Sequence, residues 1–329
     1  MVDVDSLFQS FIGKKILVIG DVMIDAYTIG QVNRLSPEAP VPIVSLDHNE
    51  YRLGGAANVA LNLVAMGAEP IICSVVGNDS PGTAMSELLE SSGISSDGLV
   101  KSNQRKTTVK TRVIANRQQL LRIDDEQTNL ITEEEAQDLV RVVEALINSG
   151  VEAIIFEDYN KGVLSPFVIE RIIELANKKG IVTTVDPKKD HFLAYKNVTL
   201  FKPNLKELKE GLGRSFDYPK DRQAFEDAIS LLEQEIQCKI AFVTLSEHGV
   251  FIKREHEKCY VNAHLRSIAD VSGAGDTVIA IATLCLCAGL NVQSIAEIAN
   301  LAGGLVCEEI GVVSINKDRL KKEIQTLQA

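Results

Sequence analysis

Two glycines and two aspartates stand directly before a long apolar run in the stretch DVSGAGDTVIAIATLCLCAGL, residues 270–290. The apolar spacing predicts a buried helix that begins at this glycine turn. The first turn of a helix leaves backbone N–H groups unpaired and carries partial positive charge. Glycine lets a backbone approach an anion closely, so Gly273, Ala274 and Gly275 are suited to hold a phosphate group.

Asp276 is the carboxylate beside this predicted anion site, where a negative charge would ordinarily be repelled. A base that removes a proton from a hydroxyl attacking the phosphate belongs at such a position. A simpler interpretation also fits, in which Asp276 caps a helix after a glycine turn. From this stretch alone, both interpretations remain open.

Two segments nearer the N-terminus add polar groups at the ends of predicted elements. IGDVMID, residues 19–25, places Asp21 and Asp25 just after an apolar strand, and LGGAANVALNL, residues 53–63, begins a second glycine-led helix that carries Asn58. Carboxylates and an amide at strand ends suit the binding of sugar hydroxyls.

Short apolar runs alternate with helical patterns along most of the chain. This alternation predicts βαβ units and an α/β fold with a mostly parallel sheet covered on both faces, in which ligands gather at the carboxyl ends of the strands. The predicted strands are 14–21, 69–77, 151–158, 180–187, 198–204 and 238–246, and the predicted helices are 54–68, 132–148, 166–178 and 219–235.

Two segments do not follow this alternation of strands and helices. They have alternating apolar positions and no helical period, and they span residues 27–53 and 105–124. We expect both to be exposed antiparallel strands that form one small β-sheet beside the main sheet. The apolar face of such a sheet needs cover from substrate, from the main domain or from a second subunit. No linker or internal repeat is evident, so we expect a single domain over residues 1–329.

The composition restricts the classes of partner. The 34 basic and 45 acidic residues give a net charge of −11, which argues against a nucleic-acid or anionic-membrane surface as the main partner. The six cysteines show no metal-binding or redox spacing, so we expect reduced packing residues. The sequence shows no secretion signal and no apolar stretch of about 20 residues, and we expect a cytoplasmic protein.

The segments GGAANVALNLVAMGA (54–68) and DVSGAGDT (270–277), with IGDVMID before them, resemble the two signatures of the ribokinase (phosphofructokinase-B) family of carbohydrate kinases. The resemblance runs over essentially the whole chain. It implies a ribokinase-like fold whose small β-sheet is a lid over the sugar. It also implies ATP and Mg²⁺ as cofactors, in-line phosphoryl transfer to a sugar hydroxyl, and Asp276 as the base.

The resemblance narrows to the kinase part of ADP-heptose synthesis proteins. It implies phosphorylation of D-glycero-D-manno-heptose 7-phosphate at O1, on the route to lipopolysaccharide core heptose. Many of those proteins carry an adenylyltransferase domain with an HxGH motif, which this sequence lacks, so we expect no adenylyltransferase domain here. The supporting segments are RLSPEAPVPIV (34–44), RQQLLRID (117–124), EDYNKG (157–162), VDPKK (185–189) and KPNLKE (202–207).

Three other functions are alternatives to this one. The first is another sugar kinase of the same family, acting on ribose or fructose, and the second is a sugar-binding regulator without catalysis. The presence of Asp276 and of the glycines before it argues against the regulator, because a protein that only binds a sugar would not need a base. A nicotinamide-dependent oxidoreductase is disfavoured because GAGDTV has Val278 where the dinucleotide fingerprint needs Gly or Ala.

The resemblance also implies roles for residues at the nucleotide and metal side. Asn204 and Glu207 would help to place Mg²⁺ and phosphates through water, although the same pair fits a helix capping box. Many family members have Gly where Ser246 stands. Asp270 and the Gly311 carbonyl resemble parts of a monovalent-cation site, for K⁺, in some members. The candidate nucleotide-binding residues are Asn204, Glu207, Thr244, Ser246, Gly249 and Asn300.

On the acceptor side, the family's positions for sugar hydroxyls correspond to Asp25, Gly54, Gly55 and Asn58. The distal phosphate of the substrate needs cations in an otherwise acidic chain, and Arg and Lys pair well with phosphate. The candidates are Arg117 and Arg122 on the predicted lid, and Lys161 and Lys188 at strand ends. The exposed apolar face of the lid predicts a homodimer built through residues 27–53 and 105–124.

Overall fold

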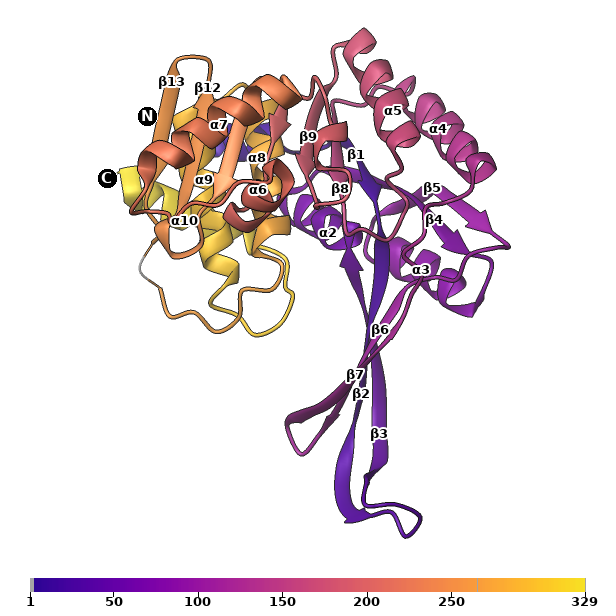
Figure 1. Cartoon of the computed structure of the whole chain (residues 1–329). Coiled ribbons are helices and arrows are strands. Elements are labelled where there is room, and N and C mark those ends of the chain that lie inside the picture. The colour runs from indigo at the N-terminus through magenta and orange to yellow at the C-terminus, as the bar shows by residue number, and fades with distance from the viewer. Residues whose placement is uncertain (1–2, 265, 329) are drawn as a thin grey trace.

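The computed structural model describes residues 3–264 and 266–328. Within these residues the chain forms a nine-stranded sheet, a separate four-stranded sheet and ten α-helices (Figure 1). The α/β architecture predicted from the sequence is confirmed, and every predicted strand and helix is present. The strand predicted at 198–204 is the shortest, Leu200–Phe201, and it ends before Pro203, which has no N–H group to donate to a neighbouring strand.

The strands of the main sheet lie in the order β13-β12-β11-β10-β9-β8-β1-β4-β5. All neighbouring pairs are parallel except those of β12 with β11 and with β13. The chain runs outward from β1 to β4 and β5, then returns to the other side of β1 with β8, so the order reverses between β1 and β8. Their bounds are β1 (Lys15–Gly20), β4 (Glu69–Gly77), β5 (Ser95–Ser102), β8 (Ala153–Glu157), β9 (Val182–Asp186), β10 (Leu200–Phe201), β11 (Ile240–Thr244), β12 (Val250–Arg254) and β13 (Glu257–Val261).

Helices cover both faces of the main sheet and divide its core into two hydrophobic clusters. In β1, Ile16 and Val18 pack into one cluster and Leu17 and Ile19 into the other, and all four are fully buried. The first cluster is completed by α1 (Val4–Ser10), α2 (Ala56–Met66), α3 (Ser80–Ser91), α8 (Ala274–Cys287), α9 (Val292–Val306) and α10 (Lys317–Gln328). The second is completed by α4 (Glu133–Ile147), α5 (Pro166–Lys179), α6 (Leu205–Leu212) and α7 (Arg222–Ile236).

The second sheet projects away from the body of the molecule (Figure 1). Its strands are β2 (Val22–Leu35), β3 (Pro42–Gly55), β6 (Val109–Ala115) and β7 (Gln118–Asp125), in the order β3-β2-β6-β7. We expected only antiparallel pairs, but β2 and β6 are parallel. The reason is that β2 follows β1 and β6 follows β5, and these parallel strands of the main sheet end at the same edge, so the segments that follow run outward together.

Strand register gives the second sheet two different faces. Asp25 pairs with Arg52 and Lys110, and Tyr27 pairs with Arg112, so these polar side chains share one face, which we call the charged face. The other face, called the apolar face, carries large side chains that are about half exposed. They are Tyr51 (53%), Leu121 (49%) and Ile123 (53%).

The six cysteines are free thiols that are buried or half-buried, as the sequence predicts. Burial raises the pKa of all six thiols, that of Cys287 to about 11, so these groups stay protonated and unreactive at neutral pH. Among the helices of the described residues, none is both long enough and apolar enough to cross a membrane.

Candidate active site

Helix α8 begins with a glycine turn, as predicted from the sequence. Gly273 is its N-cap residue and has φ +78°, a left-handed conformation that favours glycine. A Cβ at this position would lie 2.9 Å from Asn58 Nδ2 and 3.2 Å from Val312 Cγ1. Any larger residue would therefore be strained by its backbone and by its neighbours. In the turn that follows, Ala274 N donates to the Val271 carbonyl oxygen (3.3 Å), so the predicted anion site is left with the N–H groups of Gly275 and Asp276 and not that of Ala274.

Asp276 lies in the first turn of α8 but does not cap the helix. Its side chain is 7% exposed, and the N-terminus of α8 has no side-chain cap. Asn58 Nδ2 donates a hydrogen bond of 2.6 Å to Asp276 Oδ2, and Tyr159 Oη donates one of 2.9 Å to Oδ1. Burial raises the pKa of Asp276, while the two donors oppose the rise by stabilising the carboxylate. Such a group is a more effective base than an exposed aspartate.

Tyr159 is a partner that sequence reasoning missed, and Asp21 holds the loop that carries it. The buried carboxylate of Asp21 accepts hydrogen bonds from the backbone N–H groups of Tyr159 (2.9 Å), Lys161 (3.0 Å) and Val163 (3.0 Å). Asp21 follows β1 and the loop follows β8, which are neighbouring strands at the point where the strand order reverses. The residues of the IGD and EDYNKG segments are therefore coupled through one carboxylate.

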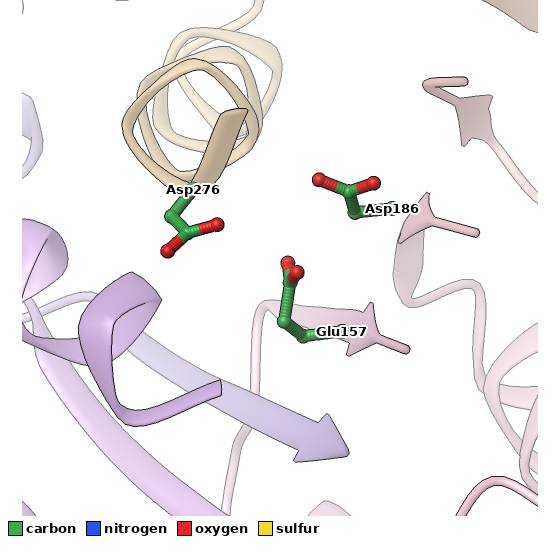
Figure 2. Close-up of side chains that lie close together, drawn as sticks. All are labelled: Glu157, Asp186 and Asp276. Atoms are coloured by element: carbon green, nitrogen blue, oxygen red, sulfur yellow. The ribbon is translucent and has the colours of Figure 1, made fainter. Parts of the chain in front are cut away.

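Three carboxylates converge beside the start of α8 (Figure 2). Glu157 ends β8, Asp186 ends β9, and one oxygen from each lies within 4.8 Å of the others and of an Asp276 oxygen. Glu157 is fully buried, and neither of its carboxylate oxygens has a hydrogen-bond partner among the described residues. Its pKa is raised well above the ordinary value by burial and by the charges of Asp186 and Asp276. The sequence signal for Glu157 and Asp186 is an acid at the last position of a buried strand.

Two lysines offset part of this negative charge. Lys202 is 2% exposed, and its Nζ lies 2.8 Å from Asp186 Oδ2. Lys188 Nζ lies 2.7 Å from Glu207 Oε1 and 3.4 Å from Asp186 Oδ1. Although burial acts to lower the pKa of Lys202, the charges of Asp186 and Glu207 outweigh it and raise that pKa. Both ammonium groups are therefore charged at neutral pH. Lys202 was also missed from the sequence.

Asn204 and Glu207 form the capping box of α6 that the sequence permits. The Asn204 side chain accepts a bond of 2.8 Å from Glu207 N, and Glu207 Oε2 accepts one of 2.8 Å from Asn204 N. Glu207 is 8% exposed, and its other oxygen contacts Lys188. The capping interpretation is correct. The same capping box also places the Glu207 carboxylate beside Lys188, at the edge of the group of carboxylates and lysines described above.

The glycines of the second segment bring Asp25 against the start of α2. A Cβ at Gly54 would lie 2.5 Å from Asp25 Oδ2, and a Cβ at Gly55 (φ +61°) would lie 2.4 Å from the Asp21 carbonyl oxygen. Asn58 in the first turn of α2 reaches Asp276. The candidate sugar residues are thus linked by contacts to the candidate base. Asp25 is 6% exposed and forms an ion pair with Arg112 of β6, a residue the sequence analysis did not select.

The four basic residues predicted for the distal phosphate are not gathered at one place. Arg117 lies in the exposed turn between β6 and β7, with φ +67°. Arg122 on β7 forms an exposed ion pair with Asp124, 2.8 Å apart. Lys161 Nζ lies 2.6 Å from a Glu126 oxygen, and Lys188 belongs to the carboxylate cluster.

The residues predicted for the nucleotide lie at the carboxyl edge of the main sheet and beyond it. Thr244 ends β11 and forms a backbone bridge with Asn204. Ser246 (φ +54°) and Gly249 (φ +87°) form the next turn, and a Cβ at Gly249 would lie 2.0 Å from the Val261 carbonyl oxygen. Asn300 on α9 donates a hydrogen bond of 2.9 Å to the Asn262 carbonyl.

The two residues predicted for a monovalent cation are in contact with each other. Gly311 N donates a hydrogen bond of 3.1 Å to Asp270 Oδ2. Asp270 Oδ1 accepts bonds from the backbone and the hydroxyl of Ser272. The K⁺ site stays a prediction.

Comparison with known proteins decides the family. Residues 13–319 match the family model described as pfkB family carbohydrate kinase. The chain belongs to the pfkB family of carbohydrate kinases. This confirms the resemblance drawn from the two glycine-led segments, and with it the assignment of the protein as a sugar kinase.

The similar curated proteins are longer than this kinase. The bifunctional protein HldE of Methylobacillus flagellatus is 38% identical over 314 residues, which cover 95% of this chain and 64% of the relative. The bifunctional protein HldE of Coxiella burnetii is 38% identical over 316 residues, which cover 96% and 64%. The chain therefore spans just under two thirds of the length of these relatives.

Solved structures of sugar kinases share the fold. Phosphofructokinase-2 from Escherichia coli in complex with potassium superposes with a TM-score of 0.76 at 19% identity, over 97% of this chain and 100% of that one. The ribokinase of Arabidopsis thaliana, complexed with ribose and ATP, superposes with a TM-score of 0.68 at 14% identity, over 94% and 99%. The ribokinase-like fold predicted from the sequence is thereby confirmed.

Proposed function

We propose that this sugar kinase transfers the γ-phosphoryl group of ATP to O1 of D-glycero-D-manno-heptose 7-phosphate, giving the 1,7-bisphosphate for lipopolysaccharide core heptose. The phosphoryl transfer is carried by one observation above all, the buried Asp276 carboxylate held by two donors at an open helix N-terminus. The choice of acceptor is supported by the similarity to HldE proteins over about 95% of the chain.

In this mechanism the protein orients the groups and stabilises charge. Asn58 and Tyr159 fix the Asp276 carboxylate, which accepts the proton from the O1 hydroxyl as the oxygen attacks the γ-phosphorus. The backbone N–H groups of Gly273, Gly275 and Asp276 would stabilise the charge on the phosphoryl oxygens, whereas that of Ala274 already donates to the Val271 carbonyl oxygen at 3.3 Å. Holding both reactants in line supplies much of the remaining acceleration.

The charges beside the base fit the divalent metal that the family implies. Four carboxylates, Glu157, Asp186, Glu207 and Asp276, face two ammonium groups, and Glu157 has two buried oxygens without a partner among the described residues. Mg²⁺ would be held through water by Asn204 and Glu207, as predicted, with Asp186 and Glu157 beside it, and it would neutralise the charge of the ATP phosphates.

A first prediction concerns the metal requirement. Glu207→Gln keeps the capping box of α6, because glutamine replaces glutamate in that motif, but removes one negative charge. We expect the Mg²⁺ concentration for half-maximal ADP release to rise by about tenfold or more. Glu135→Gln, at the same position of the capping box that begins α4, is the matched control. An unchanged Mg²⁺ profile for Glu207→Gln would exclude the role.

The proposed acceptor is tested by ADP release with Mg-ATP over a panel of sugars. The panel contains D-glycero-D-manno-heptose 7-phosphate, the same heptose without phosphate, ribose, fructose and fructose 6-phosphate. Turnover that is highest with the heptose 7-phosphate supports the proposal. Preference for ribose or fructose would replace the acceptor while keeping the kinase, and sugar binding without turnover would favour a regulator.

We further propose a homodimer formed through the apolar face of the second sheet. Its exposed side chains lie on the two edge strands of the projecting sheet, Tyr51 on β3 and Leu121 and Ile123 on β7, where water would otherwise cover them. We expect Leu121→Glu together with Ile123→Glu to convert the dimer into monomers, measured by sedimentation velocity at micromolar concentration. Leu130→Glu, equally exposed but outside the sheet, should leave the dimer intact. A wild-type chain that sediments only as a monomer would contradict the proposal.

A further inference from the structure

Two arginines share the charged face of the second sheet with the candidate sugar residue Asp25. Arg112 forms an ion pair with Asp25, and Arg52 lies directly across from Asp25 in the strand register. Both guanidinium groups lie over the ring of Tyr27, at 5.3 Å for Arg112 and 4.8 Å for Arg52. Tyr27 lies on β2, between the strands of the two arginines, and contact with its ring holds both cations near Asp25 with N–H groups free to bind other groups.

Arg52 also lies near the loop that adjoins the start of α8. A Cβ at Gly311 would lie 3.8 Å from Arg52 Nη1, and Val312 contacts the position of Gly273 at the start of α8. The loop at 311–312 thus lies between Arg52 and the anion site. From the other side, Asp25 contacts Gly54, and α2 leads from there to Asn58 and Asp276. A sugar between Asp25 and Asp276 would have this arginine pair at its far end.

Both arginines keep donors for an anion. Among the hydrogen bonds of the described residues, Arg112 uses one Nη to reach Asp25 and Arg52 uses Nε to reach Glu50. A guanidinium has five N–H donors, so several stay available on each. The charged face carries as many bases as acids within a chain of net charge −11. Its bases are Arg52, Lys110, Arg112 and Arg122, and its acids are Asp25, Glu50, Asp124 and, just after β7, Glu126, which pairs with Lys110 at 3.1 Å.

We propose that Arg112 and Arg52 bind the phosphate that the acceptor sugar already carries, and that this pair sets the preference for a phosphorylated sugar. The inference rests on the proposed function, because it requires a sugar phosphate as acceptor. Asp25 Oδ2, which lies against Gly54, accepts a hydrogen bond from a sugar hydroxyl. Of the predicted candidates, Arg117 lies in the exposed turn of the sheet and Lys161 is paired with Glu126. Arg122 is directly across from Arg112 in the register but is about half exposed and paired with Asp124.

The test compares KM for the heptose 7-phosphate with KM for the same heptose without phosphate. In Arg112→Gln and in Arg52→Gln we expect KM for the phosphorylated sugar to rise by about 10- to 100-fold. This rise corresponds to the loss of one pair of charge-assisted hydrogen bonds to the phosphate. The loss in kcat/KM for the unphosphorylated heptose should be at least tenfold smaller than the loss for the 7-phosphate, and urea unfolding of each variant checks that it is folded. Arg112→Lys should recover part of the loss. Equal losses with both sugars would overturn the inference, since Arg112 would then act only by holding Asp25.

A second measurement uses inorganic phosphate as the probe. We expect added phosphate to stimulate wild-type turnover of the unphosphorylated heptose, and to stimulate neither variant. Arg171→Gln, an exposed and ion-paired arginine on α5, is the matched control. Arg52 is the more exposed of the two arginines, so its replacement disturbs the fold less. Arg52→Gln therefore tests the phosphate site even where Arg112→Gln is unstable.

The two proposals fail in different arms of the experiment. A wild-type enzyme that uses the unphosphorylated heptose as well as the 7-phosphate overturns the proposed acceptor, and the phosphate site with it. A wild-type enzyme that prefers the 7-phosphate, with KM unchanged in both arginine variants, overturns the phosphate site alone. A rise of KM in Arg122→Gln but not in Arg112→Gln would likewise reassign the site.

Discussion

Replacing Asp276 with asparagine is expected to lower kcat/KM for phosphorylation of the sugar by about 10²- to 10⁴-fold, the usual contribution of a general base. Asparagine keeps the size of the side chain and can still meet Tyr159, but it cannot accept the proton of the attacking hydroxyl. The helix start is unaffected, because Gly273 and not Asp276 is the N-cap of α8. We therefore expect the fold and the binding of ATP to be retained.

The measurement is ADP release with Mg-ATP and the heptose 7-phosphate, with ATP affinity followed by calorimetry in the same preparations. Asp221→Asn is the matched control, because Asp221 caps the remote helix α7 and asparagine is an equally good cap. Turnover of Asp276→Asn within tenfold of wild type would exclude Asp276 as the base. Loss of ATP binding together with turnover would show that the residue has a structural role instead.

Replacing Lys202 with methionine is expected to change both stability and the pH dependence of catalysis. Lys202 is buried against Asp186, and removing one partner of a buried ion pair costs about 3–5 kcal/mol because the other charge stays behind. Lys202 also lowers the pKa of Asp276, against the effects of burial and Asp186, which raise it. Without Lys202 the pKa of Asp276 rises further.

The sign of the pH effect follows from the role of Asp276. The base acts as a carboxylate, so kcat/KM falls as the pH decreases through its pKa. A higher pKa in Lys202→Met moves this acidic limb to higher pH, which a profile of kcat/KM against pH measures directly. Urea unfolding of the same variant measures the loss of stability.

A double variant separates the two effects of Lys202. Lys202→Met with Asp186→Asn removes both charges of the pair, so much of the stability should return and the acidic limb should move back toward wild type. Lys253→Met, which breaks a half-buried pair with Glu233 outside the site, is the matched single control. An acidic limb that stays in place in Lys202→Met would show that Lys202 does not act on Asp276.

The sequence by itself determined the local chemistry and the class of fold. Alternating strands and helices predicted the main sheet, because buried parallel strands and amphipathic helices each carry a local pattern. The glycines at 54, 55 and 273 predicted open helix starts, since close approach of neighbouring atoms or a positive φ restricts those three positions to glycine. Asp276, Asn58 and Asp25 could be selected because they directly adjoin these turns.

Only the tertiary structure decided which distant residues meet. The strands β8, β9 and β10 end at one edge of the sheet, which brings Tyr159, Glu157 and Lys202 into contact with Asp276 or its neighbours. No local sequence pattern predicts this strand order. In the same way, Arg112 was no better a candidate than Arg122 in the sequence. The parallel pairing of β2 with β6 brings Arg112 to Asp25 and leaves Arg122 in solvent, since long-range register fixes which of several equivalent charges reaches the site.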